Sequence, residues 1–483
     1  MSSAKKVLVV GSGLASYGAC LALLKKKGIK IDVVDIGLEK PYKNQPNKVA
    51  ANGKDLASSY YPYGINDKRW NIKLKSNRLC SSHAKGGFSK VWSGSVLQPK
   101  SKDLVGWPKD SIPSSEDYKS ILNSIKVAQV KDELDRVFPI EPVNLETNKK
   151  GIFLGRSRIA YMNKLSMNGD LNSIPFDSSY NFQEWADAGL INYQRNIFVT
   201  HIIKNSDNKF LVFIDKSEKP LEDLYDFIFL GSGCVNTTAI VDKSLFDIGY
   251  REYFIKSAPF LLQLHLKIGK GPQNLKLLEG KDGYGLSEYF LEQCNELTSY
   301  FWSHTQISPI NKIALEKLYK LIPRNFVFLI KFIRNFFKFS LTTFHSDFSP
   351  VISMKCEVSN KDKKFRHRIK ISEANFECNS KLYNATKFAI LSKFKKLRLI
   401  PLPFSKFISN IFRANKLGAW HFGGTLPMTD KTNRFGSCSV NGEINGLNNL
   451  YIIDTSCFPS IPGSTIGLLT MANSYRIAKK SIN

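Results

Sequence analysis

The feature that most constrains the fold is a glycine-rich turn between an apolar run and a helical segment near the N-terminus. Val7–Val10 is long enough for a buried parallel strand, and Gly11 and Gly13 follow it at once. Gly11 allows the tight turn, and Gly13 lets the backbone approach a pyrophosphate at the start of the next helix. We expect that helix over Leu14–Lys27, with Ser16 as the small residue at the third glycine position.

A second strand and an acidic residue follow at the spacing that such a turn requires. Ile31–Asp35 reads as the strand, and Asp35 lies 24 residues after Gly11. A carboxylate at this place can hold the two hydroxyls of a ribose and disfavours a 2′-phosphate. The segment therefore predicts a dinucleotide-binding βαβ unit.

The same N-terminal stretch has an alternative interpretation as a targeting segment. Lysines flank the apolar residues Val7–Leu24, as in a signal peptide or a membrane span. However, Ser12, Ser16, Tyr17 and three glycines interrupt the stretch, which continues directly into a strand. We therefore expect a cytoplasmic protein.

Length and composition indicate a large globular protein. A chain of 483 residues with 43% hydrophobic residues can form two closely joined domains. Its eight cysteines are scattered, with no CxxC pair and no cluster with histidine. This pattern fits reduced thiols better than disulfides, and no metal site is expected.

Two inner segments repeat the glycine-rich character of the N-terminus. Gly86–Gly94 surrounds one tryptophan with glycines and serines, and Tyr225–Cys234 is an apolar strand that ends in Gly-Ser-Gly. Ile197–Ile202, just before the second segment, reads as a strand that could offer Val199 to an adenine. Plain turns and an ordinary core strand remain alternatives. The candidate cofactor residues in these segments are Gly86, Gly87, Ser89, Trp92, Val199, Gly231 and Ser232.

The C-terminal region brings a histidine and a helix start into one motif. His421 precedes Gly423 and Gly424, and a strand over Leu450–Ile453 leads through a Thr/Ser/Pro turn into a helix expected over Gly463–Ala478. Such a layout can bring one imidazole to the N-terminus of one helix.

Taken in order, these motifs resemble the glucose–methanol–choline (GMC) oxidoreductases. They are Gly-x-Gly near the start, GGFSKVW near residue 90, FLGSGCVNTT near residue 230, and HFGGT with NLYIIDTSCFPSIP at the end. The resemblance covers roughly a third of the chain, and the short chain looks like the compact bacterial members found with surface-polysaccharide synthesis. It implies an FAD cofactor, held non-covalently because Val91 stands where some relatives carry a flavin-linked histidine.

The resemblance also implies an α/β fold of two domains. A Rossmann-like FAD-binding domain, with a parallel sheet and helices, is expected from 1–109, 191–245 and 416–483. A substrate-binding domain with an antiparallel sheet is expected from 110–190 and 246–415.

The family's chemistry assigns roles to the C-terminal residues. His421 matches the catalytic histidine, which takes the hydroxyl proton of an alcohol while hydride passes to flavin N5. Asp454 matches the end of the flavin-contact strand, mainly through its backbone. The helix after Pro462 would point its N-terminus at the flavin. Where relatives carry a second His or Asn, this chain has Ser464 and Thr465, whose hydroxyls can orient an oxygen but are no bases.

The net charge of +28 is concentrated in two segments. Residues 311–345 carry seven basic residues and one acid, a net of +6, and residues 387–416 carry eight and no acid, a net of +8. In 325–341 three cations spaced by three and four, with many phenylalanines between them, predict an amphipathic helix. One interpretation is that 325–341 and 387–413 contact the anionic inner face of a membrane. The alternative is that 325–341 is a core helix whose basic residues form a solvated rim. No nucleic-acid motif is apparent.

Two functions remain open on the sequence. The first is an FAD-dependent dehydrogenase, rather than a fast oxidase, that acts on a CH–OH group of a glycan or lipid-linked intermediate and uses an unknown electron acceptor. The second is a catalytically degenerate, membrane-associated binding component of a biosynthetic assembly. A weaker third possibility is a flavoprotein that reduces or desaturates an apolar lipid.

Overall fold

The computed structural model describes sixteen segments of the chain. They are 4–39, 72–74, 82–90, 92–128, 152–165, 171–215, 220–246, 249–269, 289–295, 301–309, 336–348, 351–359, 366–371, 380–402, 421–431 and 436–482.

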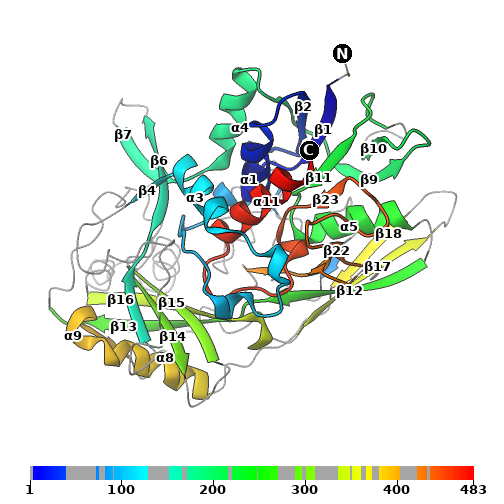
Figure 1. Ribbon diagram of the computed structural model, residues 1–483. Coiled ribbons are helices and arrows are strands. Elements are labelled where there is room, and N and C mark those ends of the chain that lie inside the picture. The colour runs from blue at the N-terminus through cyan, green and yellow to red at the C-terminus, as the bar shows by residue number, and fades with distance from the viewer. Residues whose placement is uncertain are drawn as a thin grey trace, which may run out of the picture.

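A parallel sheet of five strands forms the centre of the first layer (Figure 1). Its strands are, in spatial order, β23 (Leu450–Ile452), β11 (Phe227–Leu230), β1 (Lys5–Val10), β2 (Ile29–Val34) and β8 (Asn192–Gln194). The apolar run of β1 lies between two other strands, so both of its faces are buried, as expected for a parallel sheet. The chain thus reaches this sheet from its N-terminal, central and C-terminal parts.

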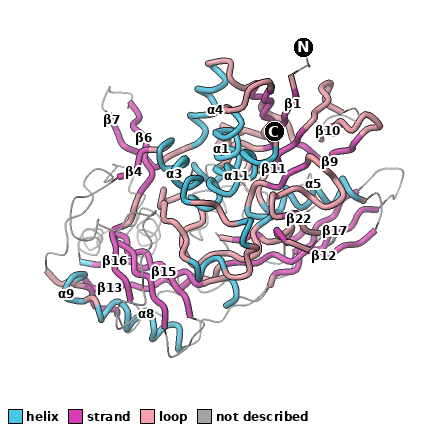
Figure 2. Tube along the Cα trace, viewed as in Figure 1, coloured by secondary structure: helices cyan, strands magenta, loops and turns pink. Residues whose placement is uncertain are grey.

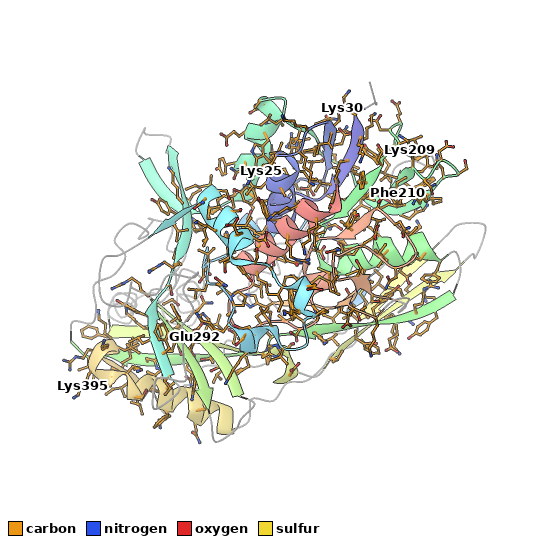
Figure 3. The ribbon with its side chains drawn as sticks, viewed as in Figure 1. Lys25, Lys30, Lys209, Phe210, Glu292 and Lys395 are labelled. Atoms are coloured by element: carbon orange, nitrogen blue, oxygen red, sulfur yellow. The ribbon has the colours of Figure 1, made fainter. Side chains whose placement is uncertain are left out.

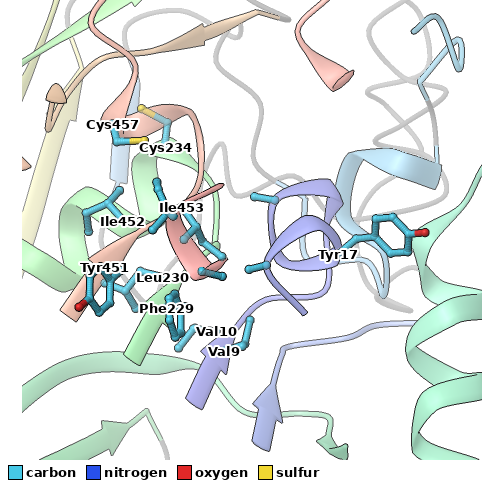
Figure 4. Packing of buried hydrophobic residues seen from close by; sticks show 14 of the residues in the cluster. Val9, Val10, Tyr17, Phe229, Leu230, Cys234, Tyr451, Ile452, Ile453 and Cys457 are labelled. Atoms are coloured by element: carbon cyan, nitrogen blue, oxygen red, sulfur yellow. The ribbon is translucent and has the colours of Figure 1, made fainter. Parts of the chain in front are cut away.

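Helices cover this sheet and pack on one another. They are α1 (Leu14–Leu23), α3 (Ser115–Ser124), α4 (Ser178–Asp187), α5 (Cys234–Leu245) and α11 (Gly467–Ser481). Helices α1 and α11 cross closely at Gly18, where an added Cβ would lie 2.2 Å from the carbonyl oxygen of Met471. Figure 4 shows the core between the strands and the helices, where Phe229 stacks on Tyr451 at 5.1 Å between ring centroids.

The other sheets lie beyond this layer and are mostly antiparallel (Figure 2). One has the order β20 (Phe422–Gly423), β12 (Gly249–Ser257), β17 (Ile352–Ser359), β18 (Arg366–Ile371) and β3 (Ile72–Leu74), with only β3 parallel to its neighbour. A six-stranded antiparallel sheet has the order β19 (Leu399–Pro401), β13 (Phe260–Lys267), β16 (Phe337–Phe344), β15 (Phe301–Pro309), β14 (Tyr289–Asn295) and β5 (Ile152–Arg156). Three small sheets complete the part of the fold that the structure describes. They comprise β4 (Lys126–Ala128), β6 (Ile159–Leu165) and β7 (Leu171–Pro175); β9 (Val199–Lys204) and β10 (Phe210–Ile214); and β21 (Met428–Thr429) and β22 (Cys438–Ser439).

This architecture confirms the predicted fold class, a parallel sheet with helices joined to antiparallel sheets. The proposed domain limits stay a prediction. Helices α3 and α4 come from the range 110–190 that we assigned to the substrate-binding domain, and they pack against α11 and α1 respectively.

The predicted amphipathic helix over 325–341 is wrong where the structure describes it. Residues 337–341 belong to strand β16, which pairs with β13 and β15 on its two sides. Phenylalanine and threonine suit a strand, and strand pairing outweighs the helical spacing of the cations. Lys338, expected on a basic helix face, is buried beside the ring of Tyr289 at 5.7 Å. Residues 325–335 lie outside the described residues.

The second basic segment is partly described. Residues 387–402 run from helix α8 (Ser380–Ser392) through α9 (Phe394–Leu397) to β19, while 403–413 lie outside the described residues. No helix in the described part of the chain is both long and apolar enough to cross a bilayer.

Candidate active site

The two glycine turns predicted to meet a dinucleotide lie against each other. Gly11 has a φ of +101°, and its N–H donates to the carbonyl oxygen of Val34 at 2.8 Å. An added Cβ on Gly11 would lie 2.6 Å from the carbonyl oxygen of Gly231, while the N–H of Gly231 donates to Val10 at 2.9 Å. Only glycine fits this backbone approach at Gly11.

The loop after Gly86 packs onto the first turn. The N–H of Gly86 donates to Ser12 Oγ at 2.8 Å, and an added Cβ on Gly87 would lie 3.3 Å from Gly13 Cα. Ser89 Oγ donates back to the Gly86 carbonyl oxygen at 2.7 Å and so closes the loop. The structure therefore brings two predicted phosphate-binding elements together, although they are about seventy residues apart in sequence.

Helix α1 begins at this point with its amide groups available to a ligand. Gly13 is the N-cap and no side chain caps the helix, so the first N–H groups face the turn. Ser16 Oγ is buried and has no hydrogen-bond partner among the described residues. A helix start with free amides and a buried orphan hydroxyl fits a bound pyrophosphate.

Asp35 ends the second strand beside Ser12. Its carboxylate accepts from Ser12 Oγ, and Tyr193 Oη lies 3.5 Å away. Burial raises the pKa of Asp35 to about 6. Strand β9 reaches the same end of the sheet, because Ile197, two residues before Val199, donates its N–H to the Asp35 carbonyl oxygen at 3.0 Å. Roles for Asp35 on a ribose and for Val199 on an adenine stay predictions.

Asp454 and Ser232 are engaged with the protein around the start of α5. Asp454 Oδ2 accepts from the Gly233 N–H at 2.8 Å and from Thr237 Oγ1 at 2.5 Å, and Ser456 bonds to Oδ1. Ser232 Oγ lies 2.9 Å from Thr237 Oγ1. The carboxylate thus ties β23 to α5, which leaves the backbone for the predicted flavin contact.

Trp92 links the Gly86 loop to the start of α11. Its indole N–H donates to the Phe176 carbonyl oxygen at 2.6 Å, and an added Cβ on Gly467 would lie 2.4 Å from the ring. The same point on Gly467 lies 3.6 Å from Leu14, at the start of α1. The first turns of α1 and α11 therefore adjoin, with the indole between the loop and α11.

His421 lies at the edge of β20 and is half-buried. Its carbonyl oxygen accepts from the Ala258 N–H at 2.9 Å, and Nδ1 is buried without a hydrogen-bond partner among the described residues. Burial and the nearby His304 lower the pKa of His421 to about 4. The lowered pKa favours the neutral form of the ring at pH 7.

Ser464 and Thr465 immediately precede α11, which begins at Gly467, four residues later than predicted. The Ser464 N–H donates to Asp103 Oδ1 at 3.1 Å. Thr465 is buried, and Oγ1 has no hydrogen-bond partner in the described part of the chain. These hydroxyls lie at the helix start, where the prediction has them face a flavin.

Sequence reasoning missed three buried groups near these residues: Asp103, Glu292 and His304. Asp103 accepts the hydrogen bond from the Ser464 N–H. Its burial and the nearby carboxylate of Glu292 both raise the pKa of Asp103. Glu292 and His304 come from neighbouring strands of the six-stranded sheet. Each stands alone in sequence without a motif, so only the folded chain associates them with the site.

Comparison with known proteins agrees with this architecture. Residues 348–474 match the family model of the GMC oxidoreductases. A crystal structure of pyridoxine 4-oxidase from Mesorbium loti is similar over 99% of both chains, with a TM-score of 0.55 and 12% sequence identity. No curated protein sequence matches the chain. The structural likeness shows a shared fold, and the similarity to the GMC oxidoreductase family model extends over residues 348–474.

Proposed function

We propose that this protein is an FAD-dependent oxidoreductase that oxidises a CH–OH group to a carbonyl. GMC oxidoreductases generally use FAD, which when bound supplies a two-electron hydride acceptor. The observation that supports the proposal is that His421 Nδ1 and the hydroxyl of Thr465, which precedes α11, are both buried without a hydrogen-bond partner among the described residues. These are polar groups that an alcohol and a flavin would satisfy.

In this proposal each group of residues has a separate role in binding or catalysis. Gly11, Gly13 and the Gly86–Gly87 loop bind the pyrophosphate, and Asp35 holds the ribose. The start of α11, with Ser464 and Thr465, meets the flavin ring and stabilises negative charge there through its N–H groups. His421 meets the hydroxyl of the substrate, and the family resemblance makes it the proton acceptor. FAD is held non-covalently; Val91 lies outside the described residues.

The substrate in our proposal is an alcohol on a glycan or a lipid-linked intermediate, and the enzyme is a dehydrogenase rather than a fast oxidase. The test is anaerobic mixing of the flavin-loaded protein with a panel of sugars, nucleotide sugars, polyprenyl-linked sugars and simple alcohols. Bleaching of the flavin absorbance near 450 nm by one class, roughly stoichiometric with carbonyl product, supports the proposal. A flavin that no alcohol reduces would favour the alternative, a catalytically degenerate binding component.

A further inference from the structure

His304 and Glu292 share one face of the six-stranded sheet. Glu292 pairs with His304 across β14 and β15, and His304 pairs with Thr343 across β15 and β16. Residues opposite one another on antiparallel strands point to the same side of a sheet. Figure 3 shows Glu292 in this sheet, and Figure 1 places α8 below the sheet in the same view.

This face is the one that looks toward the candidate active site. The other face carries Leu291 and Ile307, which pack in one apolar cluster with Ala389 of α8. On the first face, Thr343 Oγ1 donates to the carbonyl oxygen of Gly463, the residue before Ser464. The row of Glu292, His304 and Thr343 therefore reaches the segment that leads into α11.

The His304 ring is held between a carboxylate and an aromatic ring. Its Nδ1 lies 3.5 Å from Glu292 Oε1, and the ring stacks on Phe290 at 5.4 Å between centroids with a 26° tilt. The side chains of His304 and Glu292 are 0% and 1% exposed. Both ring nitrogens are buried without a hydrogen-bond partner among the described residues, so the approach of Nδ1 to Glu292 is an ion-pair contact.

A carboxylate beside Nδ1 influences which ring nitrogen carries the proton. It favours the tautomer with the proton on Nδ1, so Nε2 carries a lone pair and can accept a proton; the carboxylate then stabilises the imidazolium that forms. Nδ1 of His421 also lacks a hydrogen-bond partner, and the described residues give it no carboxylate in an ion pair like that of His304 with Glu292. Burial and His304 lower the pKa of His421 to about 4, which makes it a weak base near neutral pH.

We propose that His304, oriented by Glu292, accepts the hydroxyl proton of the alcohol, and that His421 orients the alcohol oxygen. This inference rests on the proposed function and changes the role that the family resemblance gives to His421. In the step, the O–H bond breaks and its proton passes to His304 Nε2. A flavin, when bound, would supply the oxidant that accepts the C–H electron pair as hydride. The pair left on oxygen completes the carbonyl bond.

The test compares His304→Gln with His265→Gln in the FAD-loaded protein. His265 is a matched control, because it is equally buried in the same sheet but bonds to Ser340 and belongs to the opposite face. With an alcohol that reduces the wild-type protein, His304→Gln should slow flavin reduction by about 100-fold or more while FAD stays near one per chain. His265→Gln should stay within a few-fold of wild type, and Glu292→Gln should fall between the two.

A second readout needs no turnover. In protein labelled with 15N-histidine, one ring should show a protonated Nδ1 and an unprotonated Nε2, and Glu292→Gln should remove that preference. Equal reduction rates in His304→Gln and wild type, or a protonated Nε2 on the ring that responds to Glu292→Gln, would overturn the assignment while the proposed function stands. If no alcohol reduces the flavin of the wild-type protein, both the proposed function and the assignment of His304 fail.

Discussion

At the scale of single residues, the backbone approach at Gly11 makes the binding turn intolerant of a side chain. Gly11 combines a positive φ with the carbonyl oxygen of Gly231 in the space of its missing Cβ. Gly28 has a similarly positive φ of +72° but open space around it. Substitutions at these two glycines therefore distinguish the effect of backbone strain, present at both, from that of the close carbonyl oxygen, present at Gly11 alone of the two.

We predict that Gly11→Ala abolishes FAD binding, because the turn must shift to admit the methyl group. Gly28→Ala should cost only the strain of its backbone conformation, about 1–3 kcal/mol, and should bind FAD normally. Flavin content after purification and the denaturant midpoint of each variant measure both effects. Normal flavin content in Gly11→Ala would show that the turn is not part of the cofactor site.

His421 provides the second residue-level prediction. His421→Ala removes the imidazole that meets the substrate oxygen, so alcohol-driven flavin reduction should fall by about 100-fold or more, with FAD still bound. Anaerobic stopped-flow absorbance measures the rate, and flavin released on denaturation measures the occupancy. Undiminished reduction would exclude His421 from the active site.

At the scale of elements, local patterns were predictable and tertiary groupings were not. The strand–turn–helix of β1 and α1 follows from contiguous residues, and so does the strand into Asp454. His304 and Glu292 come from separate strands with no motif around either, so nothing in the sequence could associate them with His421. The spacing of cations in 325–341 fits a helix, but the pairing of β16 with β13 and β15, which the spacing does not reveal, decides the structure there.

Helix α8 makes the membrane hypothesis testable on described residues. Phe388 and Leu391 are 55% and 41% exposed on this helix, and the exposed Lys395 and Lys396 follow on α9. If this surface binds an anionic membrane, Phe388→Ser with Leu391→Ser should weaken binding to phosphatidylglycerol vesicles at least about ten-fold, through lost apolar burial.

The matched control for this surface is on β12. Tyr250 and Phe254 are 56% and 54% exposed, and the acidic Glu252 lies between them. Their replacement by serine should leave vesicle binding unchanged. A wild-type protein that does not sediment with anionic vesicles at physiological salt would rule out the membrane surface.

At the scale of the whole molecule, buried histidines tie stability to pH. Burial lowers the pKa of His265 to about 3 in the folded protein, against 6.5 ordinarily. Between these values the unfolded chain binds a proton that the folded chain does not. The contribution of His265 is therefore intact above pH 6.5 and is lost as the pH falls toward 3.

We predict that His265→Gln flattens the pH dependence of stability within this window. The difference in unfolding free energy between wild type and variant should shrink by about 1.4 kcal/mol for each unit of pH below 6.5. Urea titrations at pH 7.5, 6 and 5 measure it. A difference that stays constant over these pH values would mean that His265 titrates alike in both states.

The proposed function depends on a bound flavin, so the flavin content of the purified protein is the decisive measurement. The protein should be yellow, and denaturation with acid should release FAD near one per chain into the supernatant, because no covalent link holds it. Folded protein that stays colourless after incubation with FAD would contradict the account, since the glycine turns and the start of α11 would then serve no flavin.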